Sequence, residues 1–113
     1  MPSLVNANSG EVLFDNLFIA DKFWSRAIGL LGRRELALNE AILIRPCSSI
    51  HTFFMRMRIN VAFVDANGVV LSVHREVPPW RLRFGERNSA FAIEYNATLA
   101  CLAPSMVVKP ASQ

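Results

Sequence analysis

The feature that most constrains the fold of this chain is a pair of β-branched runs separated by a very short polar link. Ile59–Asp65 and Val69–Val73 are joined by Ala66-Asn67-Gly68. Asn-Gly supplies the positive φ angles that a tight turn between antiparallel strands needs. We therefore predict a β-hairpin over residues 59–73, and with it an antiparallel sheet in the middle of the chain.

Other short apolar segments flank this hairpin and are separated by turn-forming residues. The predicted strands are Glu11–Ala20 with a break near Asp15-Asn16, Ala41–Arg45 ending at Pro46, Trp80–Phe84 and Ala90–Tyr95, and Ala97–Ala103 is predicted as a short helix or strand. The stretch after Asp21 has helical periodicity, with apolar residues every three or four positions up to Gly32. We therefore predict a mostly β fold with a minor α contribution (α+β): an open barrel or sandwich of short antiparallel strands with one α-helix near residues 21–32.

The length of the chain limits it to one core. At 113 residues it matches the usual size of one domain. We expect a single domain over residues 1–113, with frayed ends at about 1–10 and 110–113. No basic leader precedes an apolar stretch, and no window approaches the roughly 20 apolar residues of a membrane helix. These observations predict a soluble, cytoplasmic protein without a membrane span.

The two cysteines do not form a recognisable metal or disulfide motif. Cys47 and Cys101 stand 54 positions apart, and neither belongs to a Cys-x-x-Cys pair. With His51 and His74 they would supply four zinc ligands, but structural zinc sites normally pair their ligands roughly two to five positions apart on both halves. We therefore expect two free, mostly buried thiols, no metal and no other cofactor.

Arginine dominates the basic residues, since ten of the twelve are Arg. The planar guanidinium suits carboxylates and phosphates. Residues 41–64 contain Arg45, Arg56 and Arg58 but no acid, which favours an anionic partner, although pairing with carboxylates elsewhere in the fold would explain the same pattern. The basic residues form no run, helical stripe or recognised binding motif, so nucleic acid is not expected as a partner.

Reactive side-chain types are concentrated in the segment 46–58. If residues 50–55 form a strand, His51 shares its face with Phe53 and Met55, whereas Thr52 lies on the opposite face. A histidine among apolar neighbours is more often a structural residue than a catalyst. The candidate binding residues in and around this segment are Arg26, Arg33, Cys47, Ser49, His51, Thr52, Met55, Arg56 and Asp65.

Three motifs together resemble a known family. They are Arg26-x-x-Gly29-Leu30-Leu31-Gly32-Arg33, Pro46-Cys47-x-Ser49-Ile50-His51-Thr52-Phe53-Phe54-Met55-Arg56 and Ile59-x-Val61-x-Phe63-x-Asp65-x-x-Gly68. This combination, between about Phe14 and Tyr95, is similar to the prokaryotic domain of unknown function 192 family. The resemblance implies a compact β-rich fold with one helix, members that are often exported, and no established biochemical activity.

The chain departs from the pattern of that family at two places. Asn60 stands where the family usually has Asp, which removes one carboxylate from the motif. After Glu94, Tyr95-Asn96-Ala97-Thr98 replaces the usual glycine-containing turn, and the familiar closing Gly-Asp is not evident. We therefore expect the C-terminal edge of the fold to be shortened or altered in this chain.

Three functions are compatible with these patterns. The leading hypothesis is a non-enzymatic binding module for a small anion or a partner segment, with a cationic site lined by aromatic and Met side chains. The alternative is a small, hydrolase-like enzyme that uses His51 with Asp65 or Cys47. In a third interpretation the motif is purely structural, and Arg26 pairs with a carboxylate to hold the helix against the sheet. The sequence leaves the oligomeric state open.

Overall fold

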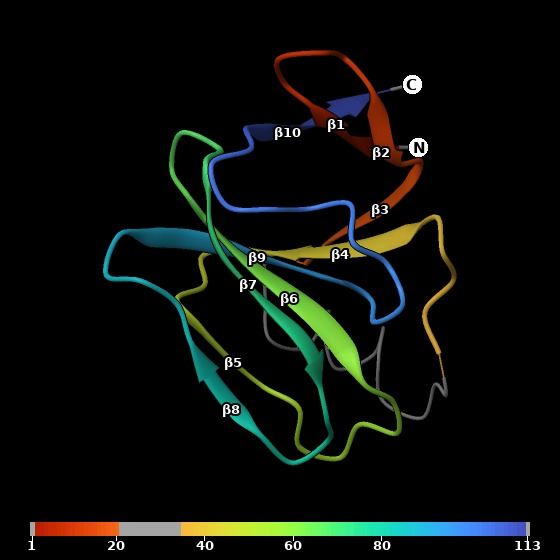
Figure 1. Cartoon of the computed structure of the whole chain (residues 1–113), viewed down its shortest axis with the longest axis vertical. Coiled ribbons are helices and arrows are strands. Elements are labelled where there is room, and N and C mark those ends of the chain that lie inside the picture. The colour runs from red at the N-terminus through yellow and green to blue at the C-terminus, as the bar shows by residue number, and fades with distance from the viewer. Residues whose placement is uncertain (1, 21–34, 113) are drawn as a thin grey trace.

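The structure is a computed structural model that describes residues 2–20 and 35–112. These two ranges contain ten strands in three open sheets. The strands are β1 (Pro2–Asn6), β2 (Val12–Phe14), β3 (Asn16–Ala20), β4 (Glu40–Ile44), β5 (Ser49–His51), β6 (Ile59–Asp65), β7 (Val70–Val77), β8 (Leu82–Phe84), β9 (Ser89–Asn96) and β10 (Val108–Ser112). The strand orders are β3-β4-β9-β6-β7, β10-β1-β2 and β5-β8 (Figure 1). The mostly β prediction is confirmed, and these sheets do not close into a barrel.

The predicted helix near residues 21–32 lies outside the described residues, so the structure leaves that prediction as it stands. Residues 97–103, predicted as a short helix or strand, are neither: they form a turn followed by irregular chain. In the two described ranges, no helix has the length and apolar character needed to cross a membrane.

The five-stranded sheet forms the centre of the fold because its inner strands, β4, β6 and β9, are largely buried on both faces. On β6, Val61 and Phe63 belong to one buried cluster, whereas Ala62 and Val64 belong to another. A sheet buried on both sides needs a layer above and a layer below. Its neighbouring strands are antiparallel except β3 and β4, which run parallel. The prediction of antiparallel strands throughout is wrong here, because residues 21–39 are long enough for the crossover that parallel strands require.

The two ends of the chain cover one face of the central sheet. Leu4, Phe14 and Val108 pack into the cluster that contains Ala62 and Val64. β1 pairs with β10 in antiparallel register over the full length of both strands, and Figure 1 shows both chain ends on this side of the sheet. The prediction of frayed ends at residues 1–10 and 110–113 is therefore wrong for these two strands, since each completes the backbone hydrogen bonds of the other.

The predicted hairpin is confirmed as β6 and β7. Asp65 fixes the turn, because its carboxylate accepts hydrogen bonds from the backbone N–H groups of Asn67 and Val69, both at 2.9 Å. Gly68 has a φ of 88° and lies so close to the carbonyl oxygen of Val108 that a Cβ would collide with it. The turn therefore requires glycine both for its backbone conformation and for its packing.

A second layer, formed by β5, β8 and the loop after β5, covers the opposite face of the sheet. Ile50, Met55 and Met57 pack against Val61 and Phe63. In Figure 1, β5 and β8 lie at the lower left, across the central sheet from the chain ends. The strand predicted over residues 50–55 ends at His51, where the chain enters a turn. That turn decides which side chains of the segment reach the surface.

Candidate functional site

The candidate site is built on the short ladder between β5 and β8. The two strands are antiparallel, with Ser49 opposite Phe84 and His51 opposite Leu82. Because residues alternate between the faces of a strand, these four side chains share one face, whereas Ile50 turns inward and is buried. The outward face of the ladder is therefore largely apolar.

Aromatic side chains from the flanking turns extend this outward face. The rings of His51 and Phe53 lie 4.9 Å apart, those of Phe53 and Trp80 are stacked at 5.8 Å, and those of Phe54 and Trp80 are tilted at 4.6 Å. Much of this surface is exposed: 68% of Phe54, 55% of Trp80, 52% of Leu82 and 69% of Phe84. We call His51, Phe53, Phe54, Trp80, Leu82 and Phe84 the aromatic patch.

Two residues of the aromatic patch have unusual backbone conformations. Phe54 and Trp80 both have a φ of 66°, in the left-handed region that bulky residues normally avoid. Each such residue costs about 1–2 kcal/mol. The conformation turns Phe54 outward and leaves its neighbour Met55 buried. Backbone strain of this kind is concentrated at functional sites, where the surrounding structure holds it in place.

The buried side chain of Thr52 holds the two strained turns together. Its hydroxyl donates to the carbonyl of Pro78 at 2.6 Å and accepts from the N–H of Arg81 at 2.9 Å. Its backbone N–H donates to the carbonyl of Arg81 at 2.9 Å, and its carbonyl accepts from the N–H of Trp80 at 3.0 Å. Thr52, predicted as a binding residue, is fully buried and positions the turns that carry Phe54 and Trp80.

The other residues predicted to bind a ligand differ in their location. Met55 is buried in the core, whereas Ser49 and Arg56 are exposed beside the aromatic patch. The expectation that His51, Phe53 and Met55 share a strand face is wrong, because the strand ends at His51. Arg26 and Arg33 lie outside the described residues, so their roles stay predictions.

The groups proposed for hydrolysis come from different elements. Asp65 ends β6, His51 ends β5, and Cys47 precedes β5. The Nδ1 atom of His51 accepts from the N–H of Phe53 at 3.3 Å, and the Cys47 thiol donates to the carbonyl of Ser49 at 3.0 Å. Both of these bonds lead to backbone groups of the same segment.

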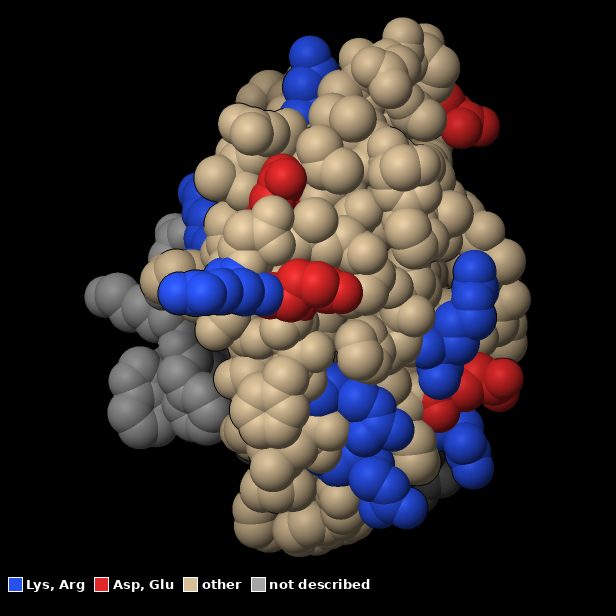
Figure 2. Space-filling model, turned by 60° about the vertical axis from the view of Figure 1, so that its left-hand side comes forward, with Lys and Arg blue, Asp and Glu red and all other residues tan. Residues whose placement is uncertain are grey.

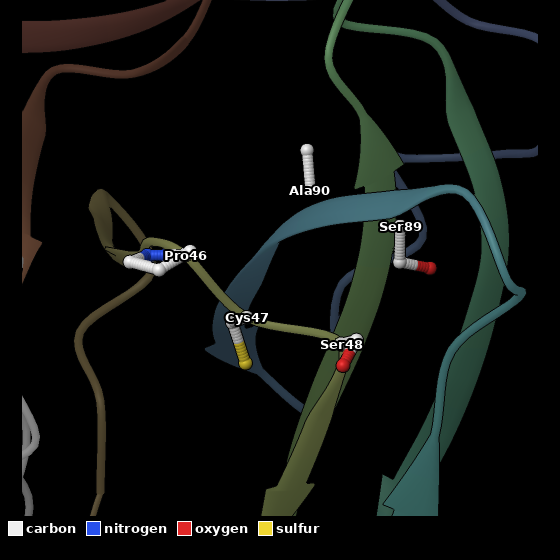
Figure 3. Close-up of a pocket in the computed structure, with 5 residues that line it drawn as sticks. All are labelled: Pro46, Cys47, Ser48, Ser89 and Ala90. Atoms are coloured by element: carbon white, nitrogen blue, oxygen red, sulfur yellow. The ribbon is translucent and has the colours of Figure 1, made fainter.

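A separate pocket of about 390 Å³ lies beside Cys47. It is lined by Pro46, Cys47, Ser48, Ser89 and Ala90. Figure 3 shows the Ser89 hydroxyl directed away from the Cys47 thiol, so the polar groups around the pocket do not point to a common centre. Cys47 and Cys101 are both half-buried and do not form a disulfide. Among residues 2–20 and 35–112, no three His, Cys, Asp or Glu side chains are grouped as metal ligands.

Positive charge accompanies the aromatic patch. Residues 45–88 contain seven Arg and three acidic residues, whereas the rest of the chain has five basic and six acidic residues. Arg81 and Arg83 alternate with the exposed side chains of Trp80, Leu82 and Phe84 along the chain. Figure 2 turns the β8 side of the molecule forward. Lys and Arg side chains gather at its lower right, with some Asp or Glu atoms among them and uncharged surface beside them.

The electrostatic effect of Arg83 extends to His74 on β7. Burial lowers the pKa of His74 below its usual 6.5, the positive charge of Arg83 lowers it further, and Glu86 opposes the shift. The imidazole also lies edge-on to the Phe63 ring, with the ring centres 5.4 Å apart. The neutral form of His74 is therefore the one that fits between β8 and the core.

Asn60 is buried, and its amide is fully used in the structure. The amide nitrogen donates to the carbonyls of Asn96 at 3.2 Å and Leu99 at 2.8 Å, and the side-chain oxygen accepts from the N–H of Glu76 at 2.9 Å. A carboxylate could not donate to the two carbonyls. Asn60 therefore binds the segment 96–99 in a way that an ionised Asp could not.

Four residues of the aromatic patch were not predicted as candidate binding residues: Phe54, Trp80, Leu82 and Phe84. One signal was available, because residues 80–84 alternate apolar and basic side chains, as expected for a strand with an exposed face. The contact between Phe54 and Trp80 could not be predicted from the sequence, because it depends on two residues in left-handed conformations that are neither Gly nor Asn.

Fold and site together define the class of protein: a small β-rich domain with a central sheet that is covered on both faces and an exposed aromatic surface on one covering layer. Residues 4–102 match the model of the family described as Uncharacterized ACR, domain of unknown function 192. The chain belongs to this family, and the identification from its three motifs is confirmed.

Similar proteins include archaeal relatives. A UPF0127 protein of Pyrococcus horikoshii is 37% identical over 79 residues, which cover 67% of this chain and 68% of the relative. A UPF0127 protein of Thermococcus sibiricus is 30% identical over 95 residues, covering 80% of this chain and 61% of the relative. The names of these relatives state no activity.

Two solved structures share the fold. A Sinorhizobium meliloti protein, assigned provisionally as a transcription regulator, has a TM-score of 0.77 and 18% identity, covering 96% of this chain and 91% of that one. A Novosphingobium aromaticivorans protein of unknown function has a TM-score of 0.78 and 18% identity, covering 96% of this chain and 82% of that one. At this identity the likeness concerns the fold alone.

Proposed function

We propose that this protein is a non-enzymatic binding module that uses the aromatic patch and its neighbouring arginines to bind a segment of a partner protein. The observation that carries the proposal is the pair Phe54 and Trp80, which are packed on each other, exposed, and held in left-handed backbone conformations. A fold that retains two such costs is expected to use the resulting surface.

The composition of the surface supports a protein segment over a small anion. Exposed apolar patches on soluble proteins mark interaction sites, and Trp, Tyr and Arg supply most of the binding energy at protein interfaces. Trp80 packs against the rings of Phe53 and Phe54 and is followed directly by Arg81. A small anion could pair with the arginines, but it would leave the aromatic rings in water.

Selection from a library of random peptides displayed on phage tests the proposal. The immobilised protein should enrich a common peptide motif, and Trp80→Ala or Phe54→Ala should weaken binding of the selected peptides by about thirtyfold. Phe18→Ala is the matched control, because Phe18 is a similarly exposed phenylalanine, at 47%, on β3. The control should bind as the wild type does.

Two results would overturn the proposal. One is a selection that yields no enriched motif, and the other is a motif that binds the Trp80→Ala, Phe54→Ala double variant as well as the wild type. Displacement of the selected peptides by single-stranded or duplex DNA would favour a nucleic-acid partner instead, since arginines beside stacked aromatic rings also occur where proteins bind single strands.

A further inference from the structure

The backbone of β8 has one edge that faces away from β5. The N–H of Thr52 donates to the carbonyl of Arg81 at 2.9 Å, and the N–H of Gly85 donates to the carbonyl of Ser48 at 2.8 Å. In an antiparallel ladder, hydrogen-bonded pairs alternate with pairs whose backbone groups point outward. Arg81, Arg83 and Gly85 therefore face β5, and the N–H and C=O groups of Leu82 and Phe84 point to the opposite edge.

This opposite edge of β8 has no neighbouring strand among residues 2–20 and 35–112. The sheet contains only β5 and β8, and Figure 1 shows β8 along the outer margin of the molecule. The carbonyl of Leu82 accepts one hydrogen bond, at 2.8 Å, from the guanidinium of the next residue, Arg83. A side chain of this kind shields an edge without pairing it, and an extended partner can displace it.

The side chains around this edge define what would pair with it. Leu82 and Phe84 project from one face of β8, and Arg83 projects from the other. A strand added alongside would place its own side chains alternately next to the apolar pair and next to Arg83. Acidic residues would suit the second set of positions, because the segment around β8 has a surplus of arginine.

Like charge disfavours pairing between two copies of this chain. If β8 paired with β8 of a second copy in antiparallel register, the Arg83 side chains of both copies would be brought together with the flanking Arg81 side chains. Like charges on neighbouring strands are destabilising. The acidic partner avoids this repulsion and gains charge-assisted contacts instead.

We infer that the outer edge of β8 binds an extended segment of a partner protein, in which acidic and apolar residues alternate, by adding it as a strand to the β5-β8 sheet. This inference rests on the proposed function and specifies its binding mode and the chemistry of the partner. Backbone groups of Leu82 and Phe84 supply the hydrogen bonds, and the aromatic patch and Arg83 supply the selectivity.

Four kinds of fluorescein-labelled heptapeptide, the last of them made in two forms, test the binding mode by fluorescence anisotropy. One alternates glutamate and valine, one has the same composition in two blocks, and one alternates lysine and valine. The fourth is the first peptide with N-methyl groups on alternate amides, made in both registers. The alternating acidic peptide should bind at least about tenfold more tightly than the block and lysine peptides. One N-methylated register should lose binding, and the other should retain it, because only every second amide of an added strand faces β8.

Variants of the protein check the edge itself. Phe84→Pro removes the outward N–H, whereas Phe84→Ala keeps it and removes the ring to the same extent. Binding of the alternating peptide should be weaker in Phe84→Pro than in Phe84→Ala by about tenfold. Arg83→Glu should reverse the preference from the glutamate peptide to the lysine peptide. Circular dichroism of each variant establishes that the fold is retained.

The outcomes separate the two proposals. One outcome is that phage selection yields peptides that need Trp80 but tolerate N-methylation in both registers. That result would support the proposed binding module and overturn the proposed strand addition. Equal binding of the block and alternating peptides would also overturn strand addition. A dimer in sedimentation equilibrium that Phe84→Pro dissociates would assign the edge to a second copy and overturn the acidic partner. Failure of both the selection and the designed peptides would overturn both proposals.

Discussion

The two layers that cover the central sheet use their apolar residues in opposite ways. In the β10-β1-β2 layer, the large side chains of Leu4 and Phe14 are turned inward and are 0% and 1% exposed. In the β5-β8 layer, Trp80 and Phe84 are turned outward. The first layer therefore contributes to stability through burial, whereas the second leaves in water much of the apolar area it could have buried. This difference supports the proposal that the β5-β8 layer, unlike the β10-β1-β2 layer, presents a binding surface.

Truncating one phenylalanine in each layer gives the largest expected difference. Phe14→Ala should lower the free energy of unfolding by about 3–5 kcal/mol, because it leaves a cavity in the core. Phe84→Ala removes the same side chain from an exposed site and should change stability by less than about 0.5 kcal/mol. Urea denaturation of both variants measures the difference. A large loss in Phe84→Ala would mean that the β5-β8 face is part of the core, and the comparison would fail.

Thr52→Val tests whether the β5-β8 layer is held by its polar contacts. The substitution keeps the shape of the side chain but leaves the N–H of Arg81 and the carbonyl of Pro78 without the hydroxyl. A loss of about 2 kcal/mol is expected, since buried polar groups lose their partner. Thr52→Ser, which retains the hydroxyl, is the control and should lose less than half as much. Denaturant unfolding gives the stabilities, and amide exchange at Arg81 shows whether the loss begins at this contact.

The sequence could predict local features better than contacts between distant residues. The hairpin of β6 and β7 depends on a turn of a few neighbouring residues that contains Asn67-Gly68. It was therefore predicted correctly. The β1–β10 pairing joins the two ends of the chain, as the bond from the Ser3 hydroxyl to the carbonyl of Ala111 illustrates. No local sequence pattern predicts this pairing. His51 and the arginines near it were predicted from composition, whereas Phe54 and Trp80 were missed because tertiary contacts impose their left-handed conformations.

At position 54, glycine should give a more stable protein than alanine, which is the reverse of their usual order. With a φ of 66°, Phe54→Gly should be more stable than Phe54→Ala by about 1 kcal/mol, because glycine adopts this conformation without the Cβ penalty. At Phe84, which lies in the extended strand β8, Phe84→Ala should be the more stable by about 0.5–1 kcal/mol. Thermal unfolding of the four variants compares the two sites. If both sites preferred alanine, the backbone at Phe54 would not be strained, and the main support for the binding surface would be removed.

The smallest expected effect concerns His74, where the β5-β8 layer meets the core. Because its pKa is lowered on folding from the usual 6.5, both states of the protein hold a neutral imidazole above that pH, and His74 then adds no pH dependence. As the pH falls below 6.5, the unfolded chain takes up the proton first, so the free energy of unfolding should decrease until the folded protein is protonated as well.

Urea titrations between pH 4 and pH 8 should show this decrease as a difference between the wild type and His74→Gln, since the carboxylates titrate in both. Adding Arg83→Gln removes the charge that helps to lower the pKa, and it should reduce the difference. Identical profiles for the wild type and His74→Gln would show that His74 does not couple the β5-β8 layer to the core.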